Sequence, residues 1–170
     1  LVIGMKLLHS NLKKGEVKVL SQNLDDLWYL SAIIEPNDIV QGKTLRKISF
    51  RAGEGAKESV KKPVFIKIFV EKAEFSKYTN VLRVSGIIRE APEDVPLGEH
   101  HTFNIDENTS VTIIKEHWLK YQLDKLKEAC SEKRSSILIC VHDREEAYFA
   151  LFKKYGYEIV THIQGEVQKK

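Results

Sequence analysis

Basic residues gather in one short stretch of the chain, between positions 43 and 62. The stretch holds two acidic residues, Glu54 and Glu58, and seven basic ones: Lys43, Arg46, Lys47, Arg51, Lys57, Lys61 and Lys62. Its net charge is therefore +5, whereas the whole chain carries only +3. Lysine and arginine neutralise phosphates and release counterions, and contacts of this kind select no base sequence. These seven residues are the candidate RNA-binding residues of the chain.

The second half of this stretch, residues 51–62, contains two glycines and many charges. Such a segment cannot supply side chains to a hydrophobic core, so we expect it to project as a mobile hairpin tip between two long strands. A charge run is also typical of a solvated turn that has no partner. From the residue types alone, both interpretations remain open.

Four carboxylates flank a predicted helix and are the candidates for metal-dependent chemistry: Asp25, Asp26, Glu35 and Asp38. Divalent cations that activate water on a phosphate need two or more converging carboxylates. Adjacent helical residues diverge by about 100°, so Asp25 and Asp26 cannot chelate one ion by themselves, and stabilisation of the helix start already explains them. A divalent-metal site that includes Asp25 and Asp38 is the alternative hypothesis.

Other residues that could do chemistry lack the neighbours they need. His100 and His101 are adjacent in a predicted strand, so their rings point to opposite faces and cannot share a metal. His142 has no serine or cysteine nucleophile at a recognisable motif position. Gly42-Lys43-Thr44 lacks the upstream glycine and the following helix of a phosphate-binding loop. We therefore expect that RNA binding requires no cofactor.

The first 115 residues are predicted to form a small β-domain with one helix. Asn23 is placed to cap this helix over residues 24–34, whose apolar side chains repeat at helical spacing. Strands are expected at 6–9, 16–20, 39–50, 63–75, 81–89, 101–105 and 110–115. Several short antiparallel strands with one helix favour a compact barrel, because closure hides the edges of the sheet.

The pattern changes from Glu116 onward. An apolar stripe that includes Trp118, Leu123 and Leu126 predicts a helix that packs on the barrel or binds a partner helix. A strand at 137–141, a helix at 143–155 between Asp143 and Gly156, and a strand at 157–163 predict the start of an α/β domain. The expected domains are therefore 1–130 and 131–170.

The cellular compartment follows from what the chain lacks. Its apolar runs fall far short of the roughly 20 residues of a membrane-spanning helix. Its two cysteines, Cys130 and Cys140, have no metal-ligand spacing, and we expect both to be reduced thiols in the core. These features predict a soluble, cytoplasmic protein.

Several segments of the chain resemble the N-terminal part of proteins of the Pelota family. They are Lys14-Gly-Glu-Val-Lys-Val-Leu20, Asn23-Leu-Asp-Asp-Leu-Trp-Tyr-Leu30, and Asp38-Ile-Val-Gln-Gly-Lys-Thr44 with Arg46. The later segments 86–90 and 97–102, together with Trp118, are similar to the family too. The likeness extends over almost the whole chain from Met5.

This resemblance implies an Sm-like β-barrel followed by the start of a central α/β domain like that of release factors. It also implies recognition of stalled ribosomes in no-go and non-stop mRNA surveillance, with the basic segment reaching the decoding centre and the mRNA channel. The implied partners of a monomeric chain are the ribosome (its empty A site, rRNA and mRNA), a GTPase of the elongation-factor class and a ribosome-splitting ABC ATPase. Some family members have been described as divalent-metal-dependent endoribonucleases, so cleavage of stalled mRNA is the alternative function.

Overall fold

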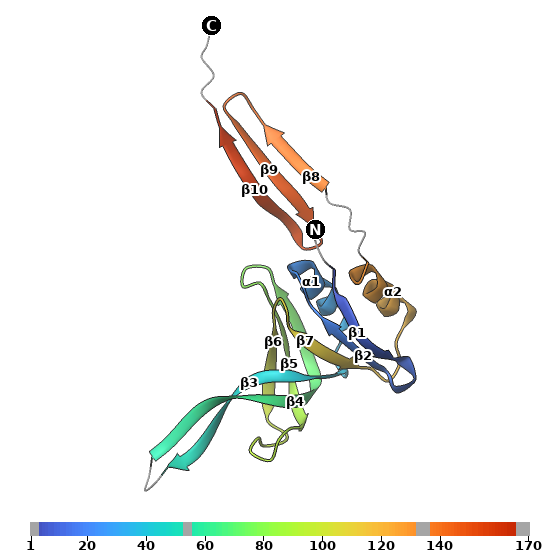
Figure 1. The fold of residues 1–170 in the computed structure, drawn as a ribbon, viewed down its shortest axis with the longest axis vertical. Helices are drawn as coiled ribbons and strands as arrows, with labels where there is room; N and C mark the ends of the chain where they lie inside the picture. The colour runs from blue at the N-terminus through green and yellow to red at the C-terminus, as the bar shows by residue number, and fades with distance from the viewer. Residues whose placement is uncertain (1–3, 53–55, 132–136, 166–170) are drawn as a thin grey trace. The chain divides into compact units, whose positions relative to one another are not determined.

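The computed structural model describes residues 4–52, 56–131 and 137–165 of the 170-residue chain. Within residues 48–52 and 56–59 it describes the backbone but not the side chains. The chain divides into two compact units, Leu1–Ser131 and Glu132–Lys170 (Figure 1). In its described residues the first unit contains seven strands and two α-helices. In chain order these are β1 (Lys6–Asn11), β2 (Glu16–Leu20), α1 (Leu24–Ile33), β3 (Ile39–Ala52), β4 (Ala56–Ser76), β5 (Val81–Glu90), β6 (His100–Ile105), β7 (Ser110–Ile114) and α2 (Lys120–Ala129). A short 3-10 helix, η1 (Leu12–Lys14), joins β1 to β2.

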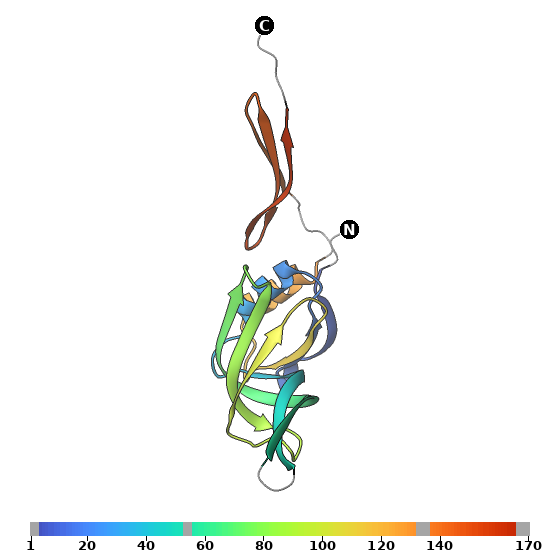
Figure 2. The ribbon, with the colours of Figure 1, turned by 90° about the vertical axis from the view of Figure 1, so that its left-hand side faces the viewer.

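The strands form one antiparallel sheet in the order β1-β2-β7-β3-β4-β5-β6. The sheet is strongly bent, as Figures 1 and 2 show, and its buried side chains belong to one hydrophobic cluster in the described residues. Alternation along β2, β4, β5 and β7 sends every second side chain inward over much of each strand. On β4, for example, Val64, Ile66, Ile68 and Val70 are all buried, as the apolar face of the predicted strand requires. The seven strands predicted for this part of the chain are confirmed.

Helix α1 begins where the sequence predicts it. The Asn23 side chain accepts a hydrogen bond from the backbone N–H of Asp26 at 3.1 Å. Leu27, Leu30 and Ile33 of α1 are fully buried in the core. Helix α2 adds Leu126 and Ala129 to the same core. No helix in the described residues has the length and hydropathy that crossing a membrane would demand.

Beyond the barrel, β3 and β4 continue as a two-stranded ribbon (Figure 1). The pairing of β3 with β7 ends at Gly42, and the pairing of β4 with β5 begins at Lys67. Between these points the two strands pair only with each other among the described strands, from Lys43↔Phe65 to Ala52↔Ala56. We call residues 43–52 and 56–66 the ribbon. The predicted projecting hairpin over residues 51–62 is confirmed, but its described residues belong to strands β3 and β4, because ladder hydrogen bonds pair them as far as Ala52↔Ala56.

The second unit is an antiparallel sheet of three strands in its described part: β8 (Ile137–His142), β9 (Glu146–Lys153) and β10 (Gly156–Gln164), in the order β10-β9-β8. The helix predicted at 143–155 is wrong, because β9 occupies this stretch and pairs on both sides. Asp143 was expected to cap a helix; instead its Oδ1 accepts from the N–H groups of Glu145 and Glu146 at 2.7 and 2.8 Å in the turn before β9.

Cys140 is exposed and Cys130 half-buried, so the prediction that both lie in the core is wrong for Cys140.

Candidate nucleic-acid interface

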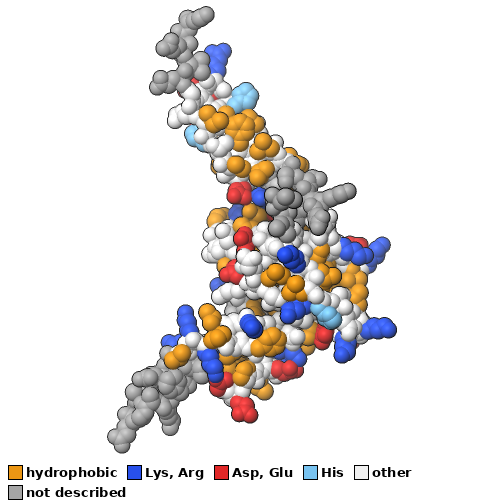
Figure 3. All heavy atoms as spheres, in the orientation of Figure 1, with side chains coloured by type: hydrophobic (Ala, Val, Ile, Leu, Met, Phe, Trp, Pro, Cys, Tyr) orange, Lys and Arg blue, Asp and Glu red, His pale blue; other side chains and the backbone are white. Residues whose placement is uncertain are grey.

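One face of the ribbon carries three exposed lysines. Antiparallel pairing places register partners on the same face of a sheet, and Lys47 is the register partner of Lys61, as Lys43 is of Phe65. Their face, which we call the lysine face, comprises Lys43, Leu45, Lys47, Lys61, Pro63 and Phe65, all exposed. Among the described residues, none of its three lysines forms an ion pair. Figure 3 shows basic and hydrophobic side chains next to one another where the ribbon leaves the barrel.

The opposite face carries the two remaining described basic residues, Arg46 and Lys62, which are register partners. Arg46 forms an ion pair with Glu99 and donates to the carbonyl oxygen of His100 at 3.2 Å. Lys62 forms an ion pair with Asp94, with 2.7 Å between Nζ and Oδ2. Both acids belong to the Pro-rich loop between β5 and β6. The structure therefore divides the described part of the predicted basic cluster into a face whose lysines pair with no described carboxylate and a face that is bound to this loop.

Arg51 and Lys57 complete the predicted cluster. They are register partners in the β3–β4 ladder. Their side chains lie outside the described residues, so only their place in the ladder is defined. The ladder continues past them to Ala52 and Ala56.

His101 lies at the junction between the ribbon and β6. Its Nε2 is 3.1 Å from the hydroxyl of Thr44, and its Nδ1 is 3.4 Å from Nη1 of Arg46. Burial, together with the positive charge of Arg46, lowers the pKa of His101 to about 4. His101 is therefore neutral at physiological pH, so that Nδ1 can accept from Arg46. The neighbouring His100 instead contacts Glu71 at 3.2 Å, as expected for rings on opposite faces.

We predict that His101 makes the first unit less stable in acid. Between its ordinary pKa of 6.5 and its folded pKa of about 4, the unfolded chain binds more protons than the folded one, so stability falls as the pH drops through this window. Because His101 is only half-buried, water screens part of the cost, and we expect a loss of about 1–2 kcal/mol. His101→Gln should remove this loss.

The measurement is denaturant unfolding at several pH values, followed by tryptophan fluorescence. The chain has two tryptophans, Trp28 and Trp118, and both lie in the first unit. His117→Gln, at an exposed histidine, is the control that should keep the pH dependence of the parent chain. An unchanged pH dependence in His101→Gln would contradict the prediction.

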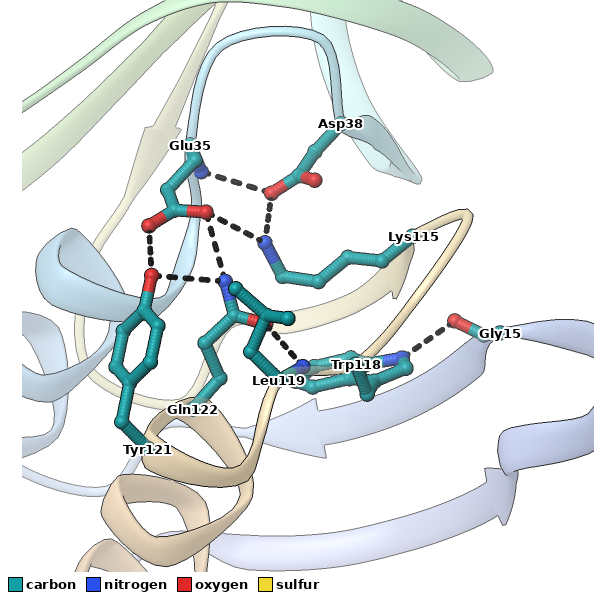
Figure 4. Close-up of polar contacts among 8 residues, drawn as sticks. All are labelled: Gly15, Glu35, Asp38, Lys115, Trp118, Leu119, Tyr121 and Gln122. Carbon is teal, nitrogen blue, oxygen red and sulfur yellow. Dashed lines mark hydrogen bonds and ion pairs between the residues drawn. The ribbon is translucent and has the colours of Figure 1, made fainter.

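A second polar cluster surrounds Lys115, whose side chain is only 2% exposed (Figure 4). Its Nζ forms an ion pair with Asp38 and lies 3.6 Å from Oε2 of Glu35. Asp38 also accepts from the backbone N–H of Glu35 at 2.8 Å. Burial raises the pKa of Asp38, although the hydrogen bonds from Lys115 and Glu35 act in the opposite direction.

Helix α2 contributes the remaining members of this cluster. The Tyr121 hydroxyl donates to Glu35, and Nε2 of Gln122 donates to Oε2 of Glu35 at 2.7 Å (Figure 4). The hydrogen bond to Glu35 raises the pKa of Tyr121. Just before the helix, Nε1 of Trp118 donates to the carbonyl oxygen of Gly15 at 2.7 Å. The cluster therefore fastens α2 to the turn after α1 and to the β1–β2 hairpin.

These contacts give structural roles to the carboxylates proposed as metal ligands. Asp38 is bound to Lys115, and the buried Asp26 accepts from the N–H groups of Met5 and Gln22 at 3.2 and 2.8 Å. Asp25 lies in the first turn of α1. Within the described part of the chain, no group of three or more His, Cys, Asp or Glu side chains is placed to hold a metal ion.

The comparison with known proteins begins with a family model. The model described as the Pelota N-terminal domain matches residues 5–130. The chain belongs to the Pelota family. A Pelota homologue from Thermococcus onnurineus (strain NA1) is 45% identical over 169 residues, which are 98% of this chain and 47% of the relative. The chain thus spans about half the length of the curated Pelota relatives that it matches.

Solved Pelota structures have the same fold. A structure described as a model of ribosome-bound archaeal Pelota and ABCE1 has a TM-score of 0.65 at 44% identity, covering 94% of this chain and 45% of that one. The crystal structure of Thermoplasma acidophilum Pelota has a TM-score of 0.69 at 24% identity, covering 94% of this chain and 44% of that one. The first unit is accordingly the Sm-like N-terminal domain of the Pelota family, as the sequence resemblance implied.

Proposed function

We propose that this chain recognises stalled ribosomes in mRNA surveillance, and that the lysine face of the ribbon binds RNA in the empty A site. The proposal includes the partners that the sequence predicts: rRNA and mRNA in the ribosome, a translational GTPase and a ribosome-splitting ABC ATPase. It places the protein in the cytoplasm as a monomer. Contact between lysines and phosphates needs no cofactor.

The observation that carries the proposal is the lysine face itself. A ribbon paired only with itself projects three exposed lysines that no described carboxylate neutralises. Contacts of this kind neutralise phosphates whatever the base sequence, which suits a factor that must act on any codon. The structure described above as ribosome-bound archaeal Pelota, at 44% identity, supports the ribosome as the binding partner.

We predict that the combined change Lys43→Gln, Lys47→Gln and Lys61→Gln weakens ribosome binding. Each lost contact to a single strand removes about 0.7 from the slope of log affinity against log salt, so the slope should flatten by roughly 2. At about 0.1 M salt this corresponds to an affinity roughly 100-fold lower. The measurement is binding to vacant ribosomes and to single-stranded RNA across a salt series.

The matched control removes three other exposed lysines of the first unit through Lys13→Gln, Lys14→Gln and Lys127→Gln. It should leave the affinity and the slope close to those of the parent chain. Equal affinity and slope in the lysine-face variant would overturn the proposal. Magnesium-dependent RNA cleavage in the same samples, abolished by Asp25→Asn and Asp38→Asn, would replace it with the endoribonuclease function.

A further inference from the structure

A pocket of about 480 Å³ lies on the outer face of the barrel, at the base of the ribbon. The side chains that shape it come from four strands and one turn. They are Lys18 on β2, Gln41 and Lys43 on β3, Phe65 on β4, and Ser110 and Thr112 on β7, with Asn108 and Thr109 in the turn before β7. None of them belongs to the polar cluster around Lys115.

The pairing of the strands explains why a pocket forms here. Thr112 is the register partner of both Lys18 and Gln41, so these three residues form a row across β2, β7 and β3. The β3–β7 ladder stops one step later, at Gly42↔Val111, while β3 continues into the ribbon. The separation of the two strands leaves the space that becomes the pocket. Its volume lies within the usual range for small-ligand sites.

The lining of the pocket suits an anion joined to a flat ring. It contains two lysines, several hydroxyl and amide side chains, and no carboxylate. In the described residues, the buried hydroxyl oxygen of Ser110 has no hydrogen-bond partner. Phe65 is 53% exposed, so its ring is accessible to a base that stacks on it. Lysines hold phosphates, and an aromatic ring accepts any nucleobase.

We propose that this pocket binds one nucleotide of a single-stranded RNA, with its phosphate between Lys18 and Lys43 and its base against the ring of Phe65. The inference rests on the proposed function. An RNA strand bound along the lysine face would reach the pocket through Lys43 and Phe65, which belong to both surfaces. Lys18 lies outside the basic cluster recognised in the sequence. A free nucleoside phosphate offers the same phosphate and base, so the test must distinguish a nucleotide within an RNA strand from a free mononucleotide.

A second pocket beside Phe65 is a poorer candidate. It has a volume of about 240 Å³ and is lined by Lys67, Glu90, Ala91 and Pro92 as well as Phe65. Its lysine is already paired with Glu90, with 2.6 Å between Nζ and Oε1. The carboxylate there would repel a phosphate, which leaves the larger pocket as the nucleotide site.

The test measures binding of a short single-stranded oligoribonucleotide and of adenosine 5′-monophosphate to the 170-residue chain. Phe65→Leu keeps an apolar side chain but removes the stacking surface, and we expect oligonucleotide affinity to fall about 5- to 50-fold. Lys18→Gln should weaken binding and reduce the salt slope by about 0.7. Lys127→Gln is the control, with the same loss of charge on α2 outside the pocket. Tryptophan-detected unfolding verifies that each variant is folded.

The outcomes separate this inference from the proposed function. If Lys47→Gln and Lys61→Gln weaken oligonucleotide binding while Lys18→Gln and Phe65→Leu do not, the pocket is overturned and the lysine face stands. If Lys18→Gln and Phe65→Leu weaken only the binding of the mononucleotide, the ligand is a free nucleotide and the RNA-strand assignment is overturned. If none of the four changes affects either probe, both proposals fail.

Discussion

Lys115→Met should lower the unfolding free energy of the first unit by about 3–5 kcal/mol at neutral pH, the usual loss when one partner of a buried ion pair is removed. Methionine fills the volume of the lysine stem but leaves Asp38 buried without its cation. Asp38 is only 9% exposed, and burial already raises its pKa. The variant must then bury a bare carboxylate or protonate it.

The pH dependence of this loss identifies its cause. Without Lys115 the folded pKa of Asp38 lies further above its ordinary value of 3.8, so the loss is present above that pKa and shrinks as the pH falls through it. The double variant Lys115→Met with Asp38→Asn should recover much of the stability, because no charge remains to be buried. A loss independent of pH, and equal in the double variant, would instead indicate that only the packing of the lysine stem matters.

Gly86→Ala should destabilise the same unit by about 3 kcal/mol, the upper range for overpacking a buried position. A Cβ atom at Gly86 would lie 2.0 Å from the carbonyl oxygen of Phe69 and 2.8 Å from its carbon. These are backbone atoms of β4, where the β4–β5 register shifts between Val70 and Lys72. The ladder itself must therefore move to admit the methyl group.

Gly98→Ala is the control for this substitution. Gly98 has a φ of +81° but nothing within 4 Å of an added Cβ. Only the strain of a left-handed backbone opposes the change, about 1 kcal/mol. Denaturant unfolding followed by tryptophan fluorescence measures both variants. Gly86 has no left-handed backbone, so a loss at Gly86 no larger than that at Gly98 would contradict the role given to the contact with Phe69.

Local signals in the sequence predicted most of the first unit. Alternation along β4 and the cap at Asn23 are properties of neighbouring residues, and the structure confirms both. The stretch 143–155 shows where such signals stop. An Asp at a helix start and an Asp in a turn offer the same side-chain oxygen to the next N–H groups, and a short apolar run fits a strand as well as a helix. Pairing with β8 and β10 decides the outcome.

The candidate interface was predicted as a cluster of residue types but not as a surface. The division between the lysine face and the face of Arg46 and Lys62 depends on the β3–β4 register and on acids that lie tens of residues away, at Asp94 and Glu99. Lys18 was missed because it comes from a distant strand. Phe65 had a visible signal, an aromatic residue on the same strand face as Lys67, which is typical of surfaces that bind single-stranded nucleic acids.

Both strands of the ribbon are edge strands, since neither has a second partner among the described strands beyond Gly42 and Lys67. Along each outer edge, every second residue therefore leaves its backbone N–H and C=O without a ladder partner. Such edges join the edges of other chains unless charge prevents it, and lysine is a residue that natural sheets use for this protection. We expect the charges of the lysine face to oppose such pairing between molecules, so the variant in which Lys43, Lys47 and Lys61 are changed to Gln should aggregate more readily than the parent chain.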